Sequence, residues 1–364
     1  RTVCFPLPGP ALQADRYQRE GGTRPFKLIF MDRRTFLASS LITTAGMAAG
    51  LPGDPIIGHG NFRYRINTNW CSGNPQQFPV KNCHEMVIDH AGKIYMTTDD
   101  TRNNIVIFNK DGKILGAWGH EYPGAHGLTL HDENGEEFLY IADYERHQVI
   151  KTRLDGTVVR TFEWPGDAGV YGSQTEFKPT ETAIAPNGDV VVADGYGKNY
   201  IIQYGQDGSV KKVFGGPEHL KNAHGIALDR RNKSNPQWLV TSRADNKLKI
   251  FDLNGNVTGT VDLPGAYICR PVIHGNEVYF AVLISKLPWD SQSGFVLILN
   301  ENNRPVSAPG GSSPIFRADG TLEPMYQTVQ VFKHPHDVLV DRDGNIYVTQ
   351  WNSGSVYPYR LERV

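Results

Sequence analysis

The sequence predicts an all-β protein with the architecture of a six-bladed β-propeller, and three observations support this prediction. A phrase of two short apolar strands joined by a turn occurs six times along the chain. A second pair of strands follows each complete copy, and corresponding points of successive units lie about 40 to 65 residues apart, which suits propeller blades with loops of different length. No segment between residues 54 and 364 has the apolar periodicity of a three-turn helix.

The clearest copy of the repeated phrase is HPHDVLVDRDGNIYVTQ, at residues 334–350. It reads as an exposed head, a short strand, a turn on Asp343 and Gly344, and a second strand. The other copies open the remaining blades at residues 83–99, 125–143, 180–194, 223–242 and 269–283. Hairpins such as residues 104–119, which turn on an Asp-Gly pair, supply the outer strands.

A propeller must close its ring, and closure usually borrows an N-terminal strand to complete the last blade. After its inner strand, the last blade contains only residues 346–350 and 355–361, so its outer strand is missing. The alternating segment at residues 61–67 is expected to supply it. The longest interval between repeats lies in blade five, where we interpret residues 285–314 as a surface insertion, because they include a stretch rich in Pro, Gly and Ser.

The N-terminal part of the chain is expected to lie outside the propeller. Residues 31–53 carry paired arginines and then a small-residue apolar run that is too short and too rich in glycine to span a bilayer. This pattern resembles a twin-arginine export signal with Met31 as the start. Residues 1–30 would then be an upstream leader, and residues 54–364 would form a periplasmic or secreted protein without stable membrane insertion.

Composition restricts the partners. The chain has 37 Lys and Arg against 38 Asp and Glu, a net charge of −1. No global field would hold a polyanion, so nucleic acid is not an expected partner. We expect a monomer that acts on a small-molecule or peptide-derived substrate.

The cysteines allow at most one disulfide bond in the propeller. Cys4 lies in the leader, which leaves Cys71, Cys83 and Cys269. Cys71 and Cys83 are the local candidates for a bond in an oxidising compartment. A zinc site built from thiolates is disfavoured because no CxxC motif occurs.

The heads of the inner strands point to a metal site. The first strand of each blade lines the axis of a propeller, so the head residues form a ring around one opening. In the six copies this ring is polar throughout, and it consists of His84, His126, Glu181, His224, approximately Arg270, and His336. Alternate blades contribute a triangle of three histidines, from blades two, four and six. Three neutral imidazoles suit a catalytic zinc with an open position, although Cu²⁺, Ni²⁺ or Fe²⁺ would fit the same ligands.

These residues resemble the peptidyl-α-hydroxyglycine α-amidating lyases, which carry an NHL-type propeller. The resemblance covers about residues 122–364. It rests on HGLTL at His126, PTE at Pro179 to Glu181 with DGY at Asp194 to Tyr196, HGIAL at His224, and PHDV at Pro335 to Val338.

The resemblance implies roles for individual residues. The three histidines of the triangle would bind zinc, Tyr196 would be the general base, and Arg243 would hold the substrate carboxylate. A structural calcium would lie in the tunnel on Asp337 and the backbone carbonyl of Leu128, because calcium prefers several hard oxygen ligands. The reaction would split a carbinolamide into an amide and glyoxylate after its hydroxyl loses a proton. Where the family has an arginine in blade one, this chain has Cys83 or His84.

Two other functions stay open at this point. A different metal-dependent propeller enzyme, such as a lactone or ester hydrolase, would use Glu181 or His84 as the base that activates water. A non-catalytic NHL-type propeller would present a face to protein or carbohydrate partners. The last alternative predicts no bound metal and no loss of function in the variant His224→Ala.

Overall fold

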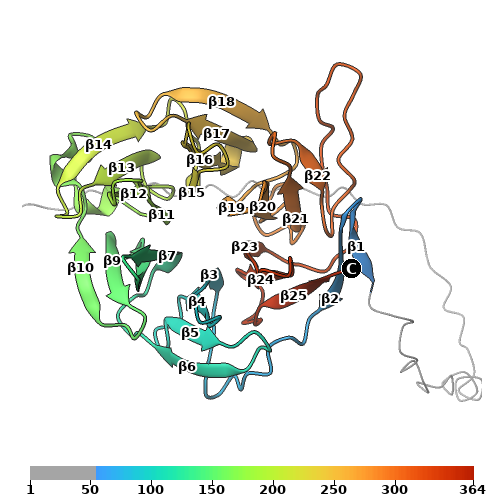
Figure 1. Ribbon diagram of the computed structural model, residues 1–364, viewed down its shortest axis with the longest axis horizontal. Helices are drawn as coiled ribbons and strands as arrows, with labels where there is room; N and C mark the ends of the chain where they lie inside the picture. Colours follow the sequence, from blue (N-terminus) through green and yellow to red (C-terminus); the bar gives the residue numbers. More distant parts are fainter. Residues whose placement is uncertain (1–54) are drawn as a thin grey trace, which may run out of the picture. The chain divides into compact units, whose positions relative to one another are not determined.

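The computed structural model describes residues 55–364, which form six β-sheets arranged as blades around a central axis (Figure 1). The predicted all-β, six-bladed propeller is confirmed. The leader and export signal proposed for residues 1–53 lie outside the described residues. In the part of the chain that the structure describes, no helix has the length and apolar character needed to cross a membrane.

The chain builds the blades in order, each from its inner to its outer strand. Blade one consists of β3 (Cys83–Ile88), β4 (Ile94–Thr98), β5 (Ile105–Phe108) and β6 (Ile114–Trp118). Blade two consists of β7 (Ala125–Glu133), β8 (Glu136–Asp143), β9 (Gln148–Arg153) and β10 (Val158–Phe162). Blade three consists of β11 (Glu181–Ile184), β12 (Val190–Ala193), β13 (Tyr200–Tyr204) and β14 (Val210–Gly215).

The second half of the ring follows the same plan. Blade four consists of β15 (Ala223–Asp229), β16 (Gln237–Ser242), β17 (Lys247–Phe251) and β18 (Val257–Asp262). Blade five consists of β19 (Val272–His274), β20 (Glu277–Val282), β21 (Phe295–Leu299) and β22 (Pro305–Ser307). Blade six consists of β23 (Pro335–Val340), β24 (Ile346–Gln350), β25 (Tyr359–Arg363), β2 (Phe62–Asn67) and β1 (Ile56–His59).

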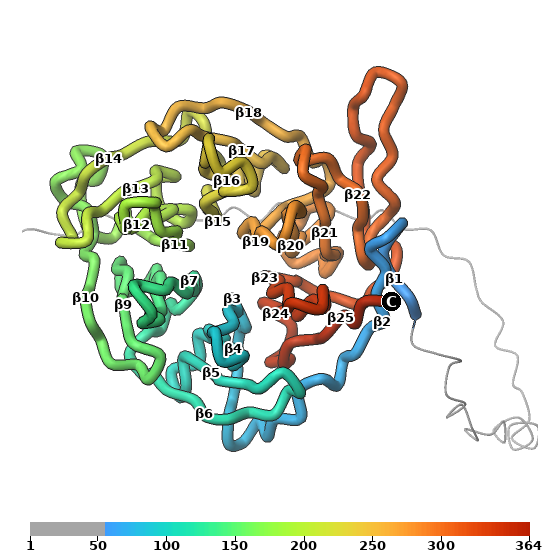
Figure 2. Tube along the Cα trace, in the orientation of Figure 1, coloured from blue at the N-terminus to red at the C-terminus, as the bar shows by residue number. Residues whose placement is uncertain are grey.

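The N-terminal strands close the ring. Strand β2 pairs antiparallel with β25, from Tyr64 opposite Arg363 to Asn67 opposite Arg360. Figure 2 shows the blue N-terminal strands beside the red C-terminal strand. The segment expected to complete the last blade therefore does so, and β1 adds a fifth strand that the sequence did not indicate.

An aspartate fixes the turn between the first and second strands of a blade. In blade six, Asp341 accepts hydrogen bonds from two backbone amides of the turn and from the Tyr347 hydroxyl. Gly344 supplies the positive φ of 78° that the turn requires. Asp89 and Tyr95 repeat the arrangement in blade one. The turn chemistry of the repeat thus holds the inner strand in register with its neighbour.

Blade five differs from the prediction. The range 285–314, interpreted as a surface insertion, contains the fully buried strand β21 and the short strand β22. The excursions are instead two loops, 283–294 and 308–334, of which the second extends beyond the ring beside β22 (Figure 1). Because all five side chains of β21 are apolar and buried between neighbouring blades, this segment belongs to the core.

The candidate disulfide bond is absent, since Cys71 and Cys83 are both free thiols. The two sulfur atoms have different partners. The Cys83 thiol is buried in β3 and donates to the carbonyl of Val356 at 3.4 Å. The Cys71 sulfur accepts a bond from the amide of Gly73 in its own loop.

Candidate metal centre

Four of the six inner strands begin with a β-bulge, and each bulge carries a histidine. The register with the second strand shifts at the heads of β3, β7, β15 and β23, whereas β11 pairs regularly. A bulge re-aims a side chain that would otherwise alternate between the faces of the sheet. The residues in these bulges are His84, His126, His224 and His336.

The four imidazoles form one buried cluster. Ring centroids of the predicted triangle lie 4.7 Å apart for His126 and His224, 4.7 Å for His126 and His336, and 4.9 Å for His224 and His336. His84 joins them at 4.7 Å from His126 and 4.8 Å from His336. All four residues are at most 2% exposed. The structure therefore brings the three predicted histidines together beside His84, and each of the two groups of ligand atoms that it forms contains two of the predicted three.

Two groups of three residues share one member, and within each group the possible ligand atoms all lie within 4.8 Å of one another. One consists of His84, His126 and His336, and the other of His224, Cys269 and His336. Cys269 was missed because the head of blade five was assigned to the next residue, Arg270. One feature of the sequence could have indicated it: Cys269 directly precedes Arg270, just as Cys83 directly precedes His84.

Backbone carbonyls fix the tautomers of two histidines. His126 Nδ1 lies 2.7 Å from the carbonyl oxygen of Thr180, and His336 Nδ1 lies 3.3 Å from that of His84. Because a carbonyl only accepts, each Nδ1 carries the proton and each Nε2 keeps a free lone pair. His336 Nε2 has no hydrogen-bond partner among the described residues. A hydrogen bond from Nδ1 to a backbone carbonyl, as in His126 and His336, is typical of histidines that bind a metal through Nε2.

The nitrogen atoms are spaced for a small cation. His126 Nε2 and His224 Nε2 stand 3.1 Å apart. Two nitrogen ligands on a tetrahedral zinc, with bonds of about 2.0 to 2.1 Å, stand about 3.3 Å apart. Burial lowers the pKa of His126, His224 and His336 well below the ordinary value. Since metal binding requires neutral imidazole, the residues present fit a zinc-type ion.

Tyr196 and Arg243 lie against this cluster. The Tyr196 hydroxyl is 3.1 Å from His126 Nε2 and 3.2 Å from His224 Nε2. Burial raises the pKa of Tyr196, and the Arg243 guanidinium opposes that effect. Arg243 Nη2 lies 3.5 Å from the Tyr196 hydroxyl, while its Nε donates to Asn222 Oδ1 at 2.6 Å. The structure thus assembles the predicted base and the predicted carboxylate-binding arginine beside the histidines.

A loop of blade five reaches the same end of the axis. Trp289, in the loop 283–294, packs on Arg243, whose guanidinium carbon is 5.5 Å from the tryptophan ring and 5.7 Å from the Tyr196 ring. Trp289 is 42% exposed and rests on Tyr267 at 5.3 Å. An exposed aromatic residue therefore stands next to the buried site, a role that the sequence did not indicate.

His84 has an acidic neighbour. Its Nε2 is 3.8 Å from Asp99 Oδ2, and neither ring nitrogen has a hydrogen-bond partner among the described residues. Burial raises the pKa of Asp99, but His84 and the two bonds from Asn82 outweigh it and hold the pKa at about 2. A carboxylate therefore stands behind His84 in blade one.

The predicted ring combined two layers of the axis. Glu181 contacts Thr182, Thr129 and Arg270 rather than the histidines. Strand β11 has no bulge at its head, so Glu181 joins the next layer along the inner strands, with Glu85 and Arg270. Neither Glu181 nor Arg270 is brought to the histidine cluster.

The expected calcium ligands are already engaged. Arg270 donates from Nε to Asp337 Oδ1 at 2.8 Å, from Nη2 to Asp337 Oδ2 at 2.9 Å, and from Nη1 to the Leu128 carbonyl at 3.0 Å. The oxygens of Asp337 and Leu128 thus surround a guanidinium group. The residues present therefore do not fit a calcium ion at this position.

Comparison with known proteins supports an NHL-type propeller. No family model matches the chain. It is 26% identical over 201 residues to human NHL repeat-containing protein 3, which covers 52% of this chain and 56% of that protein. It is also 26% identical over 267 residues to peptidyl-α-hydroxyglycine α-amidating lyase 1 of Drosophila melanogaster, covering 68% and 47% respectively. The chain spans about half the length of the curated relatives it matches.

Solved structures show the same fold. A streptogramin B lyase superposes with a TM-score of 0.51 at 14% identity, over 78% of this chain and 94% of that one. A luciferin-regenerating enzyme superposes with a TM-score of 0.52 at 12% identity, over 78% and 92%. At these identities the likeness is one of fold alone.

Proposed function

We propose that this protein is a zinc-dependent lyase that cleaves the C–N bond of a carbinolamide of the peptidyl-α-hydroxyglycine type, with an amide and glyoxylate as products. One observation carries the proposal: the Tyr196 hydroxyl lies 3.1 and 3.2 Å from the facing nitrogens of two buried, neutral histidines. The similarity to an amidating lyase over 68% of the chain supports this substrate class.

His126, His224 and His336 would hold the zinc. A zinc ion held by these residues would supply a Lewis acid that makes the substrate hydroxyl easier to deprotonate. Burial lowers the pKa of each of the three histidines, so they stay neutral. Each neutral imidazole can then bind the ion through a ring nitrogen. A substrate bound at these histidines would lie close to Tyr196, whose hydroxyl contacts His126 and His224.

Tyr196 would move the proton. As the phenolate it takes the proton of the carbinol hydroxyl, the aldehyde C=O of glyoxylate forms, and the C–N bond breaks with its electron pair on nitrogen. The proton then passes to that nitrogen, which leaves as the amide. Arg243, at 3.5 Å from the hydroxyl, favours the phenolate and so opposes the rise in the Tyr196 pKa, of which burial is the larger cause.

Arg243 would also bind the substrate carboxylate. Asn222 orients the guanidinium through Nε, and among the residues that the structure describes Nη1 has only the weak contact with Cys269 Sγ at 4.0 Å. A planar fork with donors to spare is the group that recognises a carboxylate. Trp289 covers this guanidinium and is itself exposed, so it would contact the peptide side of the substrate.

The test is direct. Purified, zinc-loaded protein is incubated with an N-acylated peptidyl-α-hydroxyglycine, and glyoxylate is measured against the spontaneous reaction. We expect stoichiometric amide and glyoxylate, and loss of both with Tyr196→Phe. If zinc-loaded protein gives only the spontaneous rate, the proposed activity is wrong.

A second candidate is a metal-dependent hydrolase of lactones or esters. The observation that favours it is His84, which stands in the cluster with Asp99 behind it at 3.8 Å and could act as a base toward water. Hydrolysis of a lactone panel that is lost with His84→Ala and kept with Tyr196→Phe would select this candidate. Export and a monomeric state stay predictions from the sequence.

A further inference from the structure

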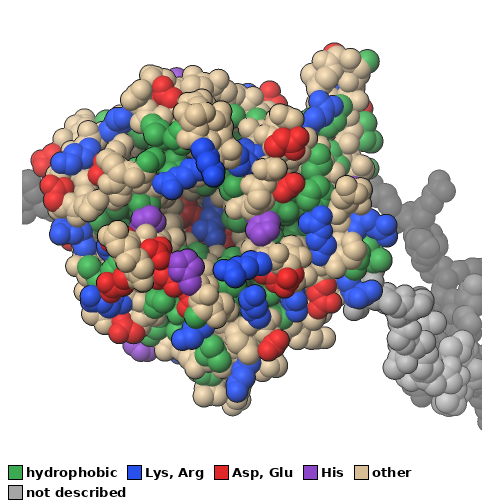
Figure 3. All heavy atoms as spheres, viewed as in Figure 1, with side chains coloured by type: hydrophobic (Ala, Val, Ile, Leu, Met, Phe, Trp, Pro, Cys, Tyr) green, Lys and Arg blue, Asp and Glu red, His purple; other side chains and the backbone are tan. Residues whose placement is uncertain are grey.

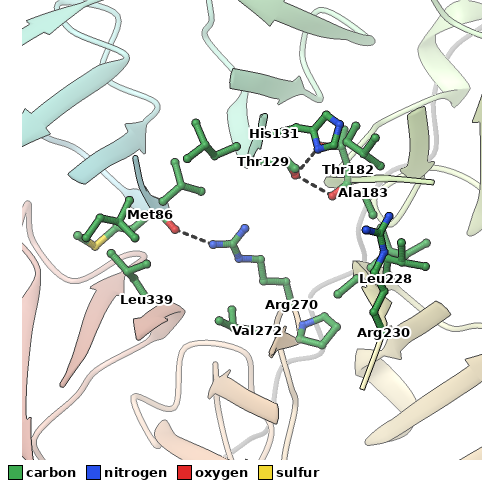
Figure 4. Close-up of a pocket in the computed structure, with 17 residues that line it drawn as sticks. Met86, Thr129, His131, Thr182, Ala183, Leu228, Arg230, Arg270, Val272 and Leu339 are labelled. Atoms are coloured by element: carbon green, nitrogen blue, oxygen red, sulfur yellow. Dashed lines mark hydrogen bonds between the residues drawn. The ribbon is translucent and has the colours of Figure 1, made fainter. Parts of the chain in front are cut away.

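The guanidinium of Arg270 occupies an oxygen-lined position on the propeller axis, one layer along the inner strands from the histidines. It donates to both carboxylate oxygens of Asp337 and to the carbonyls of Leu128 at 3.0 Å and Met86 at 2.7 Å. Figure 4 shows the side chain reaching across the axis to the Met86 carbonyl. Four oxygens from three blades thus converge on one cation.

Two further carboxylates face the same group. Arg270 Nη1 lies 3.3 Å from Glu85 Oε2 and 3.7 Å from Glu181 Oε2. The side chains of Glu85, Glu181 and Asp337 are at most 1% exposed. Glu85 Oε1 and Glu181 Oε2 have no hydrogen-bond partner among the described residues. The layer therefore holds three buried acids against a single base, and without Arg270 it would be a cage of oxygens.

The backbone is shaped to admit this arginine. A Cβ at Gly225 would lie 2.3 Å from the Cα and 2.6 Å from the Cβ of Arg270. A side chain in place of Gly225 would therefore force the backbone of Arg270 to shift. The glycine that follows His224 thus serves the charged layer, while His224 serves the metal centre.

Solvent reaches the layer from beyond it. A cavity of about 460 Å³ follows the inner strands past the charged layer, and Arg270 forms part of its wall beside Met86, Thr129 and Val272. In the face shown in Figure 3 the centre of the ring is hollowed, and Lys or Arg side chains lie in the hollow. A small ion could therefore enter this layer if Arg270 left it vacant.

We propose that Arg270 is the protein's own cation at an oxygen site that would otherwise bind a divalent ion, so that this layer takes no calcium. Carboxylates and backbone carbonyls are the ligands that Ca²⁺ prefers, and here they are arranged around a guanidinium instead. Removal of Arg270 would convert the layer into a calcium site. This inference is independent of the proposed lyase activity.

Thermal unfolding tests the proposal with protein dialysed against buffer freed of divalent ions by a chelating resin, and with zinc restored. The wild type should show the same Tm with and without about 5 mM CaCl₂, which exceeds the Kd of most protein calcium sites. Arg270→Ala should lose about 5–15 °C in Tm without calcium, because the buried carboxylate of Asp337 loses its ion-pair partner. Calcium should restore at least half of that loss.

Two controls locate the response. In Arg270→Ala/Asp337→Asn the calcium effect should disappear, because one carboxylate of the cage is gone. MgCl₂ should restore less than CaCl₂, since Mg²⁺ demands a smaller and more regular octahedron. Stabilisation of the wild type by calcium would overturn the proposal. An Arg270→Ala variant with the same Tm, or the same unfolded spectrum, with and without calcium would also overturn it. So would a calcium response that persists in Arg270→Ala/Asp337→Asn.

Discussion

Two layers on the same axis handle buried polar groups in opposite ways. In the histidine layer, the nitrogens of His84, His224 and His336 include atoms without any partner among residues 55–364. In the charged layer below it, Arg270 engages the oxygens of Asp337 and two backbone carbonyls. The first layer leaves lone pairs for an ion from outside, and the second contains its own cation.

The two layers are built from consecutive residues. His336 and Asp337 are neighbours in β23, and His84 and Glu85 are neighbours in β3. A regular strand would send such neighbours to opposite faces of the sheet. The bulge at each head instead lets both contribute to the axis. A one-residue irregularity at the head of a strand thus separates the histidine layer from the charged layer.

We expect the greatest loss of activity from a substitution beside the histidine layer that leaves the metal ligands intact. Tyr196→Phe should lower kcat about 10²- to 10⁴-fold, the usual contribution of a general base. Zinc content should be unchanged, because the histidines are intact. Tyr144→Phe is the matched control, since the Tyr144 ring packs 5.4 Å from Tyr196. Equal losses in both variants, measured by glyoxylate release, would contradict a role for the Tyr196 hydroxyl.

A second change breaks only the charged layer. Asp337→Asn leaves the buried Arg270 without its bidentate partner, and should lower the free energy of unfolding by about 3–5 kcal/mol. Denaturant unfolding measures this loss. Zinc per folded chain should stay at the wild-type level. Loss of zinc from folded Asp337→Asn protein would show that the two layers are not separate.

A third change tests substrate recognition beside the histidine layer. Arg243→Lys keeps the charge but loses the planar fork, and one charged hydrogen bond contributes about 1.5–3 kcal/mol. The expected loss in kcat/KM is therefore about 10- to 150-fold. Steady-state kinetics should show it mainly in KM, and a substrate without the carboxylate should be insensitive to the substitution.

Much of this arrangement could be predicted from the sequence. The repeats fixed the blade count, and the head positions brought His126, His224 and His336 together. The layers could not be separated, because periodicity does not reveal which heads are bulged. Glu181, at an unbulged head, was therefore placed with the histidines. The contact between Arg270 and the Leu128 carbonyl joins residues far apart in sequence, so no local pattern indicated it.

The smallest expected effect concerns the proton balance of the charged layer. Burial, together with the charge of Glu181, raises the pKa of Glu85 well above its ordinary value of 4.5. The folded protein therefore holds a proton that the unfolded chain releases above that pH, and the associated stability is lost as pH rises through the raised pKa. Glu85→Gln has no such proton to lose.

Glu85→Gln should thus change the free energy of unfolding by less than about 1.4 kcal/mol, the equivalent of one pKa unit, at pH 5. Relative to the wild type, it should gain stability as pH rises. Urea unfolding at pH 5, 6.5 and 8 measures the difference. A wild type that gains stability over Glu85→Gln as pH rises would reverse the sign and contradict a raised pKa.

We predict that the histidine layer takes an external metal ion and that the charged layer does not. Elemental mass spectrometry of purified residues 54–364, wild type beside His224→Ala and Arg270→Ala, tests it most directly. We predict about one zinc per wild-type chain, no stoichiometric calcium in it, and loss of the zinc in His224→Ala alone. A wild-type protein without a stoichiometric transition metal, or a zinc that persists in His224→Ala, would contradict the account.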